Sequence, residues 1–532
     1  MITARPPTPP GAPPIRIVAV MTSLVLALIP VQLDAMVTAT ALPSIAGELG
    51  GFDRIAWIAT LYLLTMAIGT AAGGRLGDQF GRRGVLIAAQ VVFLAGSLWA
   101  ALAGDMTMLL LARAVQGIGA GITFTSLMAT VADIAPPHKR AKYQSVFGAI
   151  APISMIAGPW IGGLITDNLG WRWIFAVNIP IIAVATVGVA VLLRLPRTSS
   201  GGRIDALGLT AISVTGTGWV LAGSWVGQYG WVSAPVLASA AVGVAGVAVT
   251  WIVERRAAHP FLPPTLFRDR AVFMSVVVLA LAMGAVMMAA INYLPIFMQL
   301  VQGRSAGNSG LLLLPMLIPA IAVALLIGRW TTEPGRFRPA LVVGTAVLTA
   351  GSALLATMGD STAAWQTAVF MVVVGAGVGM LFQTPLVLVQ NAAPPQEVGA
   401  ATGGASFLRM IGGALGVGTL GSIFADRLSA HLAASGVPAI RGLDAATLDP
   451  AHVAALPETA RQAVVDAASS ANSLLFIVAT GFAAAAFLAA LAVPRQREPD
   501  ATDDGGSPGG GPPDDATLAT TGDRGPVAAG PS

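Results

Sequence analysis

The sequence of 532 residues contains no cysteine, only two lysines and few charges of either sign. Without cysteine the chain forms no disulfide, offers no thiolate nucleophile and holds no Cys-ligated zinc or iron–sulfur site. Its four histidines are scattered without ligand spacing, so no bound metal is expected. Charged residues make up 10% of the chain, against about 25% in a soluble domain, and 55% of the residues are hydrophobic. Such a chain cannot cover its surface with polar groups, which indicates a polytopic helical membrane protein.

Apolar runs follow one another along most of the chain. A helix needs about 20 predominantly apolar residues to cross a bilayer. Fourteen runs come close to this length: 17–40, 55–72, 85–103, 108–129, 143–165, 173–193, 207–226, 234–253, 272–297, 308–327, 340–358, 365–387, 400–424 and 473–493. The runs 308–327 and 400–424 are the weakest, because Gly, Pro and Arg interrupt them.

Lysine and arginine are distributed unequally between alternate loops. If the N-terminus is cytoplasmic, 21 of them fall inside, six fall outside, and two lie within spans. Because positive charge is retained on the cytoplasmic side, we expect a multi-pass protein of the cytoplasmic membrane with both termini in the cytoplasm. The net charge of +4 comes from these short loops and indicates no nucleic-acid partner.

Three segments are expected to lie outside the membrane. Residues 1–15 are Pro-rich and predict a disordered leader, and residues 495–532 predict a disordered cytoplasmic tail. Residues 425–472 form the longest extracytoplasmic loop, in which "PETARQAVVDAAS" is compatible with a short surface helix.

Two pairs of loop sequences indicate an internal repeat. "GRLGDQFGRR" at 74–83 resembles "GRWTTEPGRFR" at 328–338, and "IAPPHKRAK" from 134 resembles "AAPPQEVGA" from 392. The offsets of 254 to 258 residues correspond to six helices plus an inserted pair. We therefore expect two bundles, 16–200 and 257–494, flanking an inserted helix pair at 201–256. Transporters use such parallel repeats, with the substrate site between the halves.

The motifs, taken in order, resemble the major facilitator superfamily, specifically its fourteen-helix drug:proton antiporters. The resemblance covers residues 17–493. It rests on the 74–83 loop and on "LLLARAVQGIGAG" (109–121), "GAIAPISMIAGPWIGG" (148–163), "LDAMVTATALP" (33–43), "WRWIFAVNIP" (171–180) and "YLPIFMQLVQG" (293–303). It implies an all-α polytopic membrane protein with the major facilitator fold, two six-helix bundles plus an inserted two-helix hairpin. The implied function is proton-coupled efflux of amphipathic drugs or antibiotics by alternating access.

The 74–83 loop supplies the residues of an expected gate. Glycines allow close backbone approach and positive φ, and Asp78 and Arg82 are spaced to pair on a helical turn. The resemblance implies that this loop latches the two bundles on the cytoplasmic side, and a simple positive-inside anchor is the alternative. The gating residues are Gly74, Asp78, Gly81, Arg82 and Arg83.

The fifth span concentrates residues that bend a helix or allow close packing. Proline removes a backbone hydrogen bond, and glycines four apart leave a flat face for another helix. A bent, closely packed helix suits the interface between two rocking bundles, and in the family this motif marks exporters. Ordinary small-residue packing is the alternative. The motif residues are Gly148, Pro152, Gly158, Pro159, Gly162 and Gly163.

Asp34 is the only one of 25 acidic residues that lies clearly within a span. Proton coupling needs a group that is charged in one state and neutral in another, and a carboxyl group in a low dielectric can serve near neutral pH. A cationic drug would favour the charged form, so drug and proton would compete. Asp34 follows Ile17 by 17 residues, roughly 25 Å along the helix, which predicts a place in the outer half of the membrane behind Pro30. An interfacial cap is the alternative.

Two arginines lie within spans. A charge there costs about 2.5–3.5 kcal/mol, so it normally faces an aqueous cavity or a partner. Arg113 is expected to take part in proton coupling or to pin helices through backbone carbonyls. Arg409 either snorkels to the membrane surface or contacts substrate.

The remaining candidates for the substrate cavity are polar or aromatic side chains near Asp34. Asn292 is included because the repeat offset of 258 carries Asp34 onto it. No acid occurs in the run 308–327, which leaves monovalent, zwitterionic and neutral substrates open. The candidates are Gln32, Thr38, Trp57, Tyr62, Asn292, Gln299 and Arg409.

We expect small amphipathic substrates, protons and the lipid bilayer as partners, no cofactor, and function as a monomer. Dedicated export of one metabolite, lipid or siderophore is the alternative within transport. A transport-inactive membrane sensor is a remote alternative from another class. An enzyme is not expected, because the sequence offers no P-loop lysine, metal cluster or nucleophile–base pair.

Overall fold

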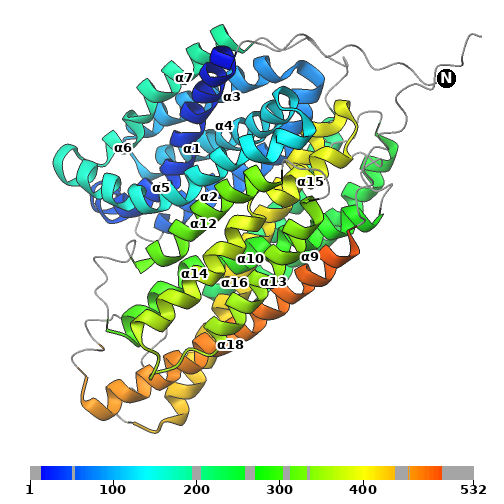
Figure 1. Ribbon diagram of the computed structural model, residues 1–532. Coiled ribbons are helices and arrows are strands. Elements are labelled where there is room, and N and C mark those ends of the chain that lie inside the picture. Colours follow the sequence, from blue (N-terminus) through cyan, green and yellow to red (C-terminus); the bar gives the residue numbers. More distant parts are fainter. Residues whose placement is uncertain are drawn as a thin grey trace, which may run out of the picture. The chain divides into compact units, whose positions relative to one another are not determined.

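The computed structural model describes residues 14–50, 54–193, 205–257, 270–303, 312–331, 336–437, 453 and 456–493. The predicted tail, most of the leader and the middle of the long loop therefore lie outside the described residues. Within these ranges the chain forms helices joined by turns, without strands (Figure 1). The predicted all-α fold class is confirmed.

The helices follow one another closely along the chain. Single 3₁₀ turns at Pro137–Lys139 and Pro395–Glu397 precede α5 and α16. The helices are α1 Pro14–Leu49, α2 Ile55–Phe80, α3 Arg82–Ala101, α4 Met106–Ile134, α5 Arg140–Leu169, α6 Arg172–Ala176, α7 Asn178–Leu192, α8 Ala206–Tyr229, α9 Ala234–Arg256, α10 Arg270–Leu300, α12 Leu314–Trp330, α13 Phe337–Ala356, α14 Ala364–Leu381, α15 Thr384–Ala392, α16 Val398–Ala434 and α18 Glu458–Ala492.

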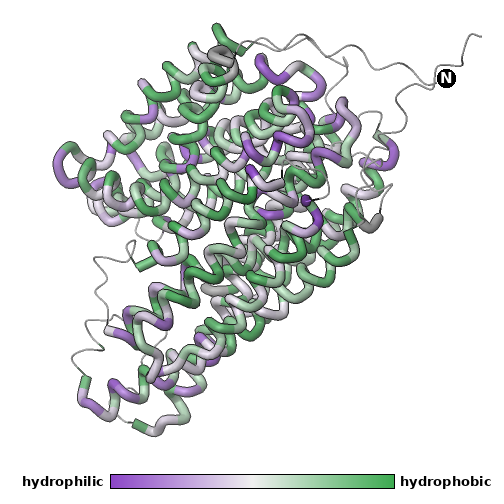
Figure 2. Tube along the Cα trace, viewed as in Figure 1, coloured by the Kyte–Doolittle hydropathy of each residue, from purple (hydrophilic) through white to green (hydrophobic). Residues whose placement is uncertain are grey.

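The helices account for all fourteen apolar runs. In the described part of the chain, 13 helical segments are long and apolar enough to cross a bilayer, and α12 is a shorter apolar helix of 17 residues. The α6–α7 and α14–α15 pairs each correspond to one run. Figure 2 shows apolar residues along the lengths of the helices, as a bilayer requires.

Several helices extend beyond the predicted spans. α16 continues to Ala434 and α18 begins at Glu458, so both reach into the predicted 425–472 loop. The segment predicted as a separate surface helix is instead the first part of α18. Ala460, Val464 and Ala468 recur at helical spacing and are all buried, which explains why this amphipathic stretch joins the bundle.

Two sets of helices pack among themselves. In the first, α1 contacts α5 and α7, and α4 contacts α2 and α3. In the second, α10 contacts α16 and α18, and α14 contacts α12 and α13. The inserted helices α8 and α9 pack on each other, and α8 also contacts α2 and α16. The bundle boundaries at 200 and 257 stay predictions.

Two helix pairs form the most extensive contacts between the sets, α2 with α16 and α5 with α12. The repeat relates them, because α2 corresponds to α12 and α5 to α16. They meet where α2, α4 and α12 end. We call this end of the molecule the arginine-rich end, since Arg75, Arg82, Arg83, Arg140 and Arg329 lie there.

Candidate functional site

Asp34 lies near the middle of α1 and is 3% exposed. The apolar span of α1 runs from Val18 to Leu49, so Asp34 has about equal lengths of helix on either side. The middle of so long a helix does not fix its depth in a bilayer, so the predicted place in the outer half of the membrane stays a prediction. The apolar run seemed to end before Pro43, but the helix continues through this proline.

Both carboxylate oxygens of Asp34 are occupied. Oδ2 forms an ion pair with Nη1 of Arg113 on α4, and both side chains are 1% exposed. Oδ1 accepts hydrogen bonds from Nε2 of Gln116 at 2.8 Å and from Nδ2 of Asn178, at the start of α7, at 3.2 Å. The carboxylate therefore ties α1 to α4 and α7 in a place closed to water.

Arg113 is enclosed as completely as its partner. Its Nη1 donates to Oε1 of Gln116 at 2.6 Å, and its Nε donates to the carbonyl of Ile58 at 3.4 Å. Its guanidinium lies 4.1 Å from the ring centroid of Tyr62 and 5.6 Å from that of Phe175. Arg113 thus binds an acid and a backbone carbonyl together, and its expected part in proton coupling stays a prediction.

The sequence did not reveal this pairing, because 79 residues separate the two charges. Gln116 and Asn178 lie in the motifs 109–121 and 171–180 that carry the resemblance, but neither was assigned to the site. With its oxygens occupied, Asp34 offers no free carboxylate to a cationic drug. Simple competition between drug and proton at Asp34 therefore does not fit this conformation.

The glycines of α5 place the segment of α1 that follows Asp34. A Cβ on Gly158 would lie 2.4 Å from Cβ of Met36, and one on Gly162 would lie 2.4 Å from Oγ1 of Thr40. Only glycine allows this approach. These two glycines therefore pack within the first set of helices and not at the expected interface between sets.

The other motif residues of α5 differ among themselves. A Cβ on Gly148 would lie 3.2 Å from the side chains of Phe382 and Gln383, so this position faces the second set of helices. A Cβ on Gly163 would meet no atom within 4 Å. Pro152 and Pro159 lie inside α5, which continues through both.

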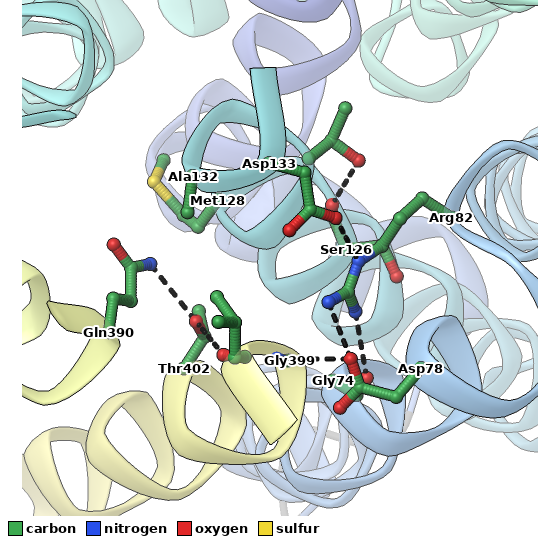
Figure 3. A network of polar contacts seen from close by, with 12 residues as sticks. Gly74, Asp78, Arg82, Ser126, Met128, Ala132, Asp133, Gln390, Gly399 and Thr402 are labelled. Carbon is green, nitrogen blue, oxygen red and sulfur yellow. Dashed lines mark hydrogen bonds and ion pairs between the residues drawn. The ribbon is translucent and has the colours of Figure 1, made fainter. Parts of the chain in front are cut away.

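At the arginine-rich end, Asp78 of α2 meets the N-terminus of α16 (Figure 3). Its Oδ2 accepts from the backbone N–H of Ala400 at 2.8 Å, and its Oδ1 from that of Gly399 at 3.2 Å. A carboxylate at a helix N-terminus satisfies free N–H groups and complements the helix dipole. This contact fastens the first set of helices to the second.

Arg82 holds Asp78 in place. Its Nη2 pairs with Asp78, its Nε donates to Oδ2 of Asp133 on α4 at 2.8 Å, and its Nη1 donates to the carbonyl of Gly74 at 3.2 Å. Arg83 instead donates to the carbonyl of Ala190 at the end of α7. Arg83 therefore contacts its own set of helices.

Gly74 and Gly399 bring the backbones of α2 and α16 into contact. A Cβ on Gly74 would lie 1.9 Å from the carbonyl oxygen of Gly399, and one on Gly399 would lie 2.2 Å from that of Gly74. Gly81, between α2 and α3, has φ of 90°, a conformation that favours glycine. We call Gly74, Asp78, Arg82, Gly399 and Ala400 the α2–α16 latch.

The repeat places a second close contact at the same end. The offsets 254 and 258 carry Gly74 to Gly328 and Ala141 to Gly399. A Cβ on Gly328 would lie 2.8 Å from the carbonyl oxygen of Ala141 and 2.5 Å from Oγ of Ser145. The α5–α12 contact thus matches the α2–α16 contact.

Arg140 and Gln144 of α5 add polar bonds to the second set of helices. Arg140 donates to the carbonyl of Gln390 at 3.0 Å and to Oδ1 of Asn391 at 2.9 Å. Gln144 donates to Oε1 of Gln390 at 2.7 Å. The sequence analysis missed these residues, although Arg140 lies in a loop that revealed the repeat and the others lie within two residues of those loops.

The predicted cavity residues are scattered. Tyr62 belongs to the Asp34 cluster, and its hydroxyl donates to the carbonyl of Val31 at 3.1 Å. Trp57 packs edge-on against Trp225 of α8, with ring centroids 6.2 Å apart, and so faces the inserted pair. Asn292 is exposed and donates to the carbonyl of Met288 in its own helix at 2.8 Å.

None of the remaining three polar candidates is hydrogen-bonded to Asp34. Thr38 is buried and its hydroxyl has no partner. Gln32 and Gln299 are partly buried.

Arg409 lies where α16 faces α4 and the end of α14. Its Nη1 donates to the carbonyl of Phe382 at 3.1 Å, and its guanidinium lies 4.8 Å from the ring of Phe382 and 5.8 Å from that of Phe124. The head group remains among these rings and is only partly exposed. This position agrees with the cavity assignment better than with snorkelling.

Two hollows meet at Phe382. The first lies between α5 and the second set of helices and is lined by apolar residues including Met155, Met287 and Met316. The second is lined in part by Ser406 and Arg409, and both are narrow in this conformation. Within the described ranges, no three His, Asp or Glu side chains come together as a metal site requires.

The paired bundles of apolar helices, the buried ion pair and the contacts between bundles define a membrane transporter. The Major Facilitator Superfamily profile matches residues 24–417, and the chain belongs to this family. It is 34% identical to an uncharacterised MFS-type transporter of Mycobacterium tuberculosis, over 90% of this chain and 69% of that one. It is 33% identical to the multidrug transporter protein MdtP of Bacillus subtilis, over 80% of this chain and 78% of that one.

The solved structures agree on the fold. The crystal structure of the human organic anion transporter MFSD10 matches with a TM-score of 0.57 and 15% identity, covering 89% of this chain and 100% of that one. The predicted family resemblance and fold class are therefore confirmed.

Proposed function

We propose that this transporter exports amphipathic small molecules, including drugs or antibiotics, in exchange for protons across the cytoplasmic membrane. The observation that carries the proposal is the buried pair of Asp34 and Arg113, closed to water by two amide side chains and two aromatic rings. A carboxylate in a dry site is retained where a function needs it, because burying it is costly. The similarity to a named multidrug transporter supports export of drugs.

In this mechanism the proton acts on the contacts of α1. Protonation removes the negative charge that holds Arg113, and the neutral acid no longer accepts from Arg113, Gln116 and Asn178 equally. The bonds that tie α1 to α4 and α7 then weaken. Since α1 also packs on Gly158 and Gly162 of α5, a shift of α1 reaches α5 and through it α12.

The α2–α16 latch determines which side is closed. In this conformation Asp78 and the two glycines hold the bundles together at the arginine-rich end. If that end is cytoplasmic, as 21 of the 29 basic residues indicate, this conformation is closed to the cytoplasm. Loading a substrate from the cytoplasm then requires the latch and the α5–α12 contact to separate. A monomer is sufficient, because both contacts lie within one chain.

Proteoliposomes test the coupling. The purified protein is reconstituted with a fluorescent amphipathic dye, a pH gradient is imposed, and dye movement is compared for the wild type, Asp34→Asn and Asp167→Asn. Asp167 is an exposed acid near the end of α5 and serves as the matched control. We expect gradient-driven transport by the wild type and by Asp167→Asn, and transport independent of the gradient in Asp34→Asn.

A double variant serves as the control for the unpaired charge that Asp34→Asn leaves on Arg113. Asp34→Asn with Arg113→Gln removes both charges, so loss of coupling in this variant cannot result from an unpaired buried cation. Normal coupling in the double variant would contradict a role for Asp34.

A further inference from the structure

Arg409 is a partly buried charge that has no opposite charge beside it in the part of the chain that the structure describes. Arg113 is paired with Asp34, and Arg82 is paired with Asp78 and Asp133. Among the described residues, no carboxylate lies within ion-pair distance of Arg409. A guanidinium carries five N–H donors, and the one bond formed here goes to the carbonyl of Phe382.

This cation lies at membrane depth and at the boundary between the bundles. Arg409 follows the first residue of α16 by 11 positions, about 17 Å along the helix. Its ring contacts come from Phe382 in the second bundle and Phe124 in the first. Alternating access exposes this boundary to each side in turn, and a retained charge there marks a substrate path.

A second polar group faces the same hollow. Ser406 precedes Arg409 by three residues and so lies on the same face of α16. Its side chain is 2% exposed, and its hydroxyl has no hydrogen-bond partner. Ser406 and Arg409 both line the second hollow, whose other walls are apolar side chains such as Met283 and Leu386. A hydroxyl donor and a cation in an apolar hollow are complementary to a single anionic group.

The neighbouring hollow suits an apolar substituent. It meets the hollow of Ser406 and Arg409 at Phe382, is narrow in this conformation, and is lined by apolar side chains that include Met155, Met287 and Met316. Methionine side chains adapt to differently shaped apolar groups, which is typical of surfaces that accept several ligands.

We propose that Ser406 and Arg409 form a subsite for the carboxylate of an amphipathic anion or zwitterion, whose apolar body extends over Phe382 into the methionine-lined hollow. The inference rests on the proposed export function and assigns its substrate class. It differs from the expectation of a cationic drug at Asp34, since the carboxylate of Asp34 is already paired and Arg409 is not.

Binding to the purified protein in nanodiscs tests the subsite. The probes are dansylglycine, its uncharged methyl ester and the cation dansylethylenediamine, which share one fluorescent apolar body. We expect the wild type to bind dansylglycine at least tenfold more tightly than the ester. Arg409→Gln should bind both equally, Arg409→Lys should keep part of the preference, and Ser406→Ala should reduce it.

Arg427→Gln is the control. Arg427 is an exposed arginine on the same helix, so its loss should leave the preference intact. Binding of the ester by Arg409→Gln, with an affinity close to that of the wild type, reports that the variant is folded. Equal binding of all three probes by the wild type, or a carboxylate preference retained in Arg409→Gln, would overturn the subsite.

The binding assay uses no gradient, so it separates the two proposals. A carboxylate preference that depends on Arg409, together with transport that ignores the pH gradient, contradicts proton exchange and supports the subsite. Gradient-driven export of the cationic probe by a protein without carboxylate preference supports exchange and contradicts the subsite.

Discussion

Replacing Gly74 by alanine should open the arginine-rich end. The added Cβ would lie 1.9 Å from the carbonyl oxygen of Gly399 and 2.5 Å from its carbonyl carbon. Both atoms belong to a backbone, so α2 and α16 must separate by more than an ångström to reach van der Waals contact. Overpacking of this kind costs about 1–3 kcal/mol.

The cost falls on one conformation only. In a form in which α2 and α16 are apart, the methyl group meets no such obstacle. A difference of about 1–3 kcal/mol then shifts the equilibrium between the two forms by roughly 5- to 150-fold toward opening. As long as the open form is the minor one, its population should therefore rise by about this factor in Gly74→Ala.

Pulsed electron–electron double resonance can measure this shift, because a chain without cysteine needs no background substitutions. Spin labels are placed at His138→Cys and Gln396→Cys. These positions are exposed, are related by the repeat offset of 258, and precede α5 and α16 at the arginine-rich end. We expect a longer label-to-label distance to gain population in Gly74→Ala.

Gly84→Ala provides the control. Gly84 is a helical glycine of α3 at the same end, and a Cβ there would meet no atom within 4 Å. Its distance distribution should match that of the unsubstituted protein. An unchanged distribution in Gly74→Ala, or an equal change in Gly84→Ala, would refute the latch.

Three further predictions concern Asp34, α5 and the membrane potential. Asp34→Asn leaves a buried guanidinium unpaired and should lower the free energy of unfolding by about 3 kcal/mol, measured by denaturant titration in detergent, while Asp34→Asn with Arg113→Gln should recover part of this loss. Equal stability of the single and double variants would contradict the pairing. Gly158→Ala and Gly162→Ala should reduce transport far more than Gly163→Ala, because the added Cβ atoms at 158 and 162 would lie 2.4 Å from atoms of α1, whereas one at 163 would meet no atom within 4 Å. Equal effects of the three substitutions in an efflux assay would show that α1–α5 packing is unimportant. Exchange of one proton for a monoanion moves two charges across the membrane, worth about 4.6 kcal/mol per 100 mV, whereas exchange of one proton for a monocation moves no net charge. A membrane potential set by potassium and valinomycin should therefore change the steady-state gradient of dansylglycine and leave that of dansylethylenediamine unchanged.

The fold could be predicted almost entirely from the sequence. Each apolar run corresponds to one helix or to two consecutive helices, since a bilayer leaves the backbone few alternatives to a helix. The errors were at helix ends. α1 passes through Pro43 and α18 begins at Glu458, where packing of a buried face outweighs the local signal.

The candidate site was predicted in part. Asp34, Arg113 and Tyr62 were identified from their residue types and position, and they meet in one cluster. Their pairing was missed because it depends on contacts between helices far apart in the sequence. Trp57 and Asn292 were assigned to the same cavity, but the direction of a side chain on a helix is fixed by the neighbouring helices and not by the local sequence.

Proton movement coupled to the substrate tests the central claim most directly. A pH-sensitive dye is enclosed in proteoliposomes without an imposed pH gradient, and an outward or inward gradient of the substrate is then applied. The wild type should move protons opposite to the substrate, and Asp34→Asn with Arg113→Gln should transport the substrate without moving protons. Substrate transport by the wild type with no proton movement, or with protons moving in the same direction, would contradict exchange.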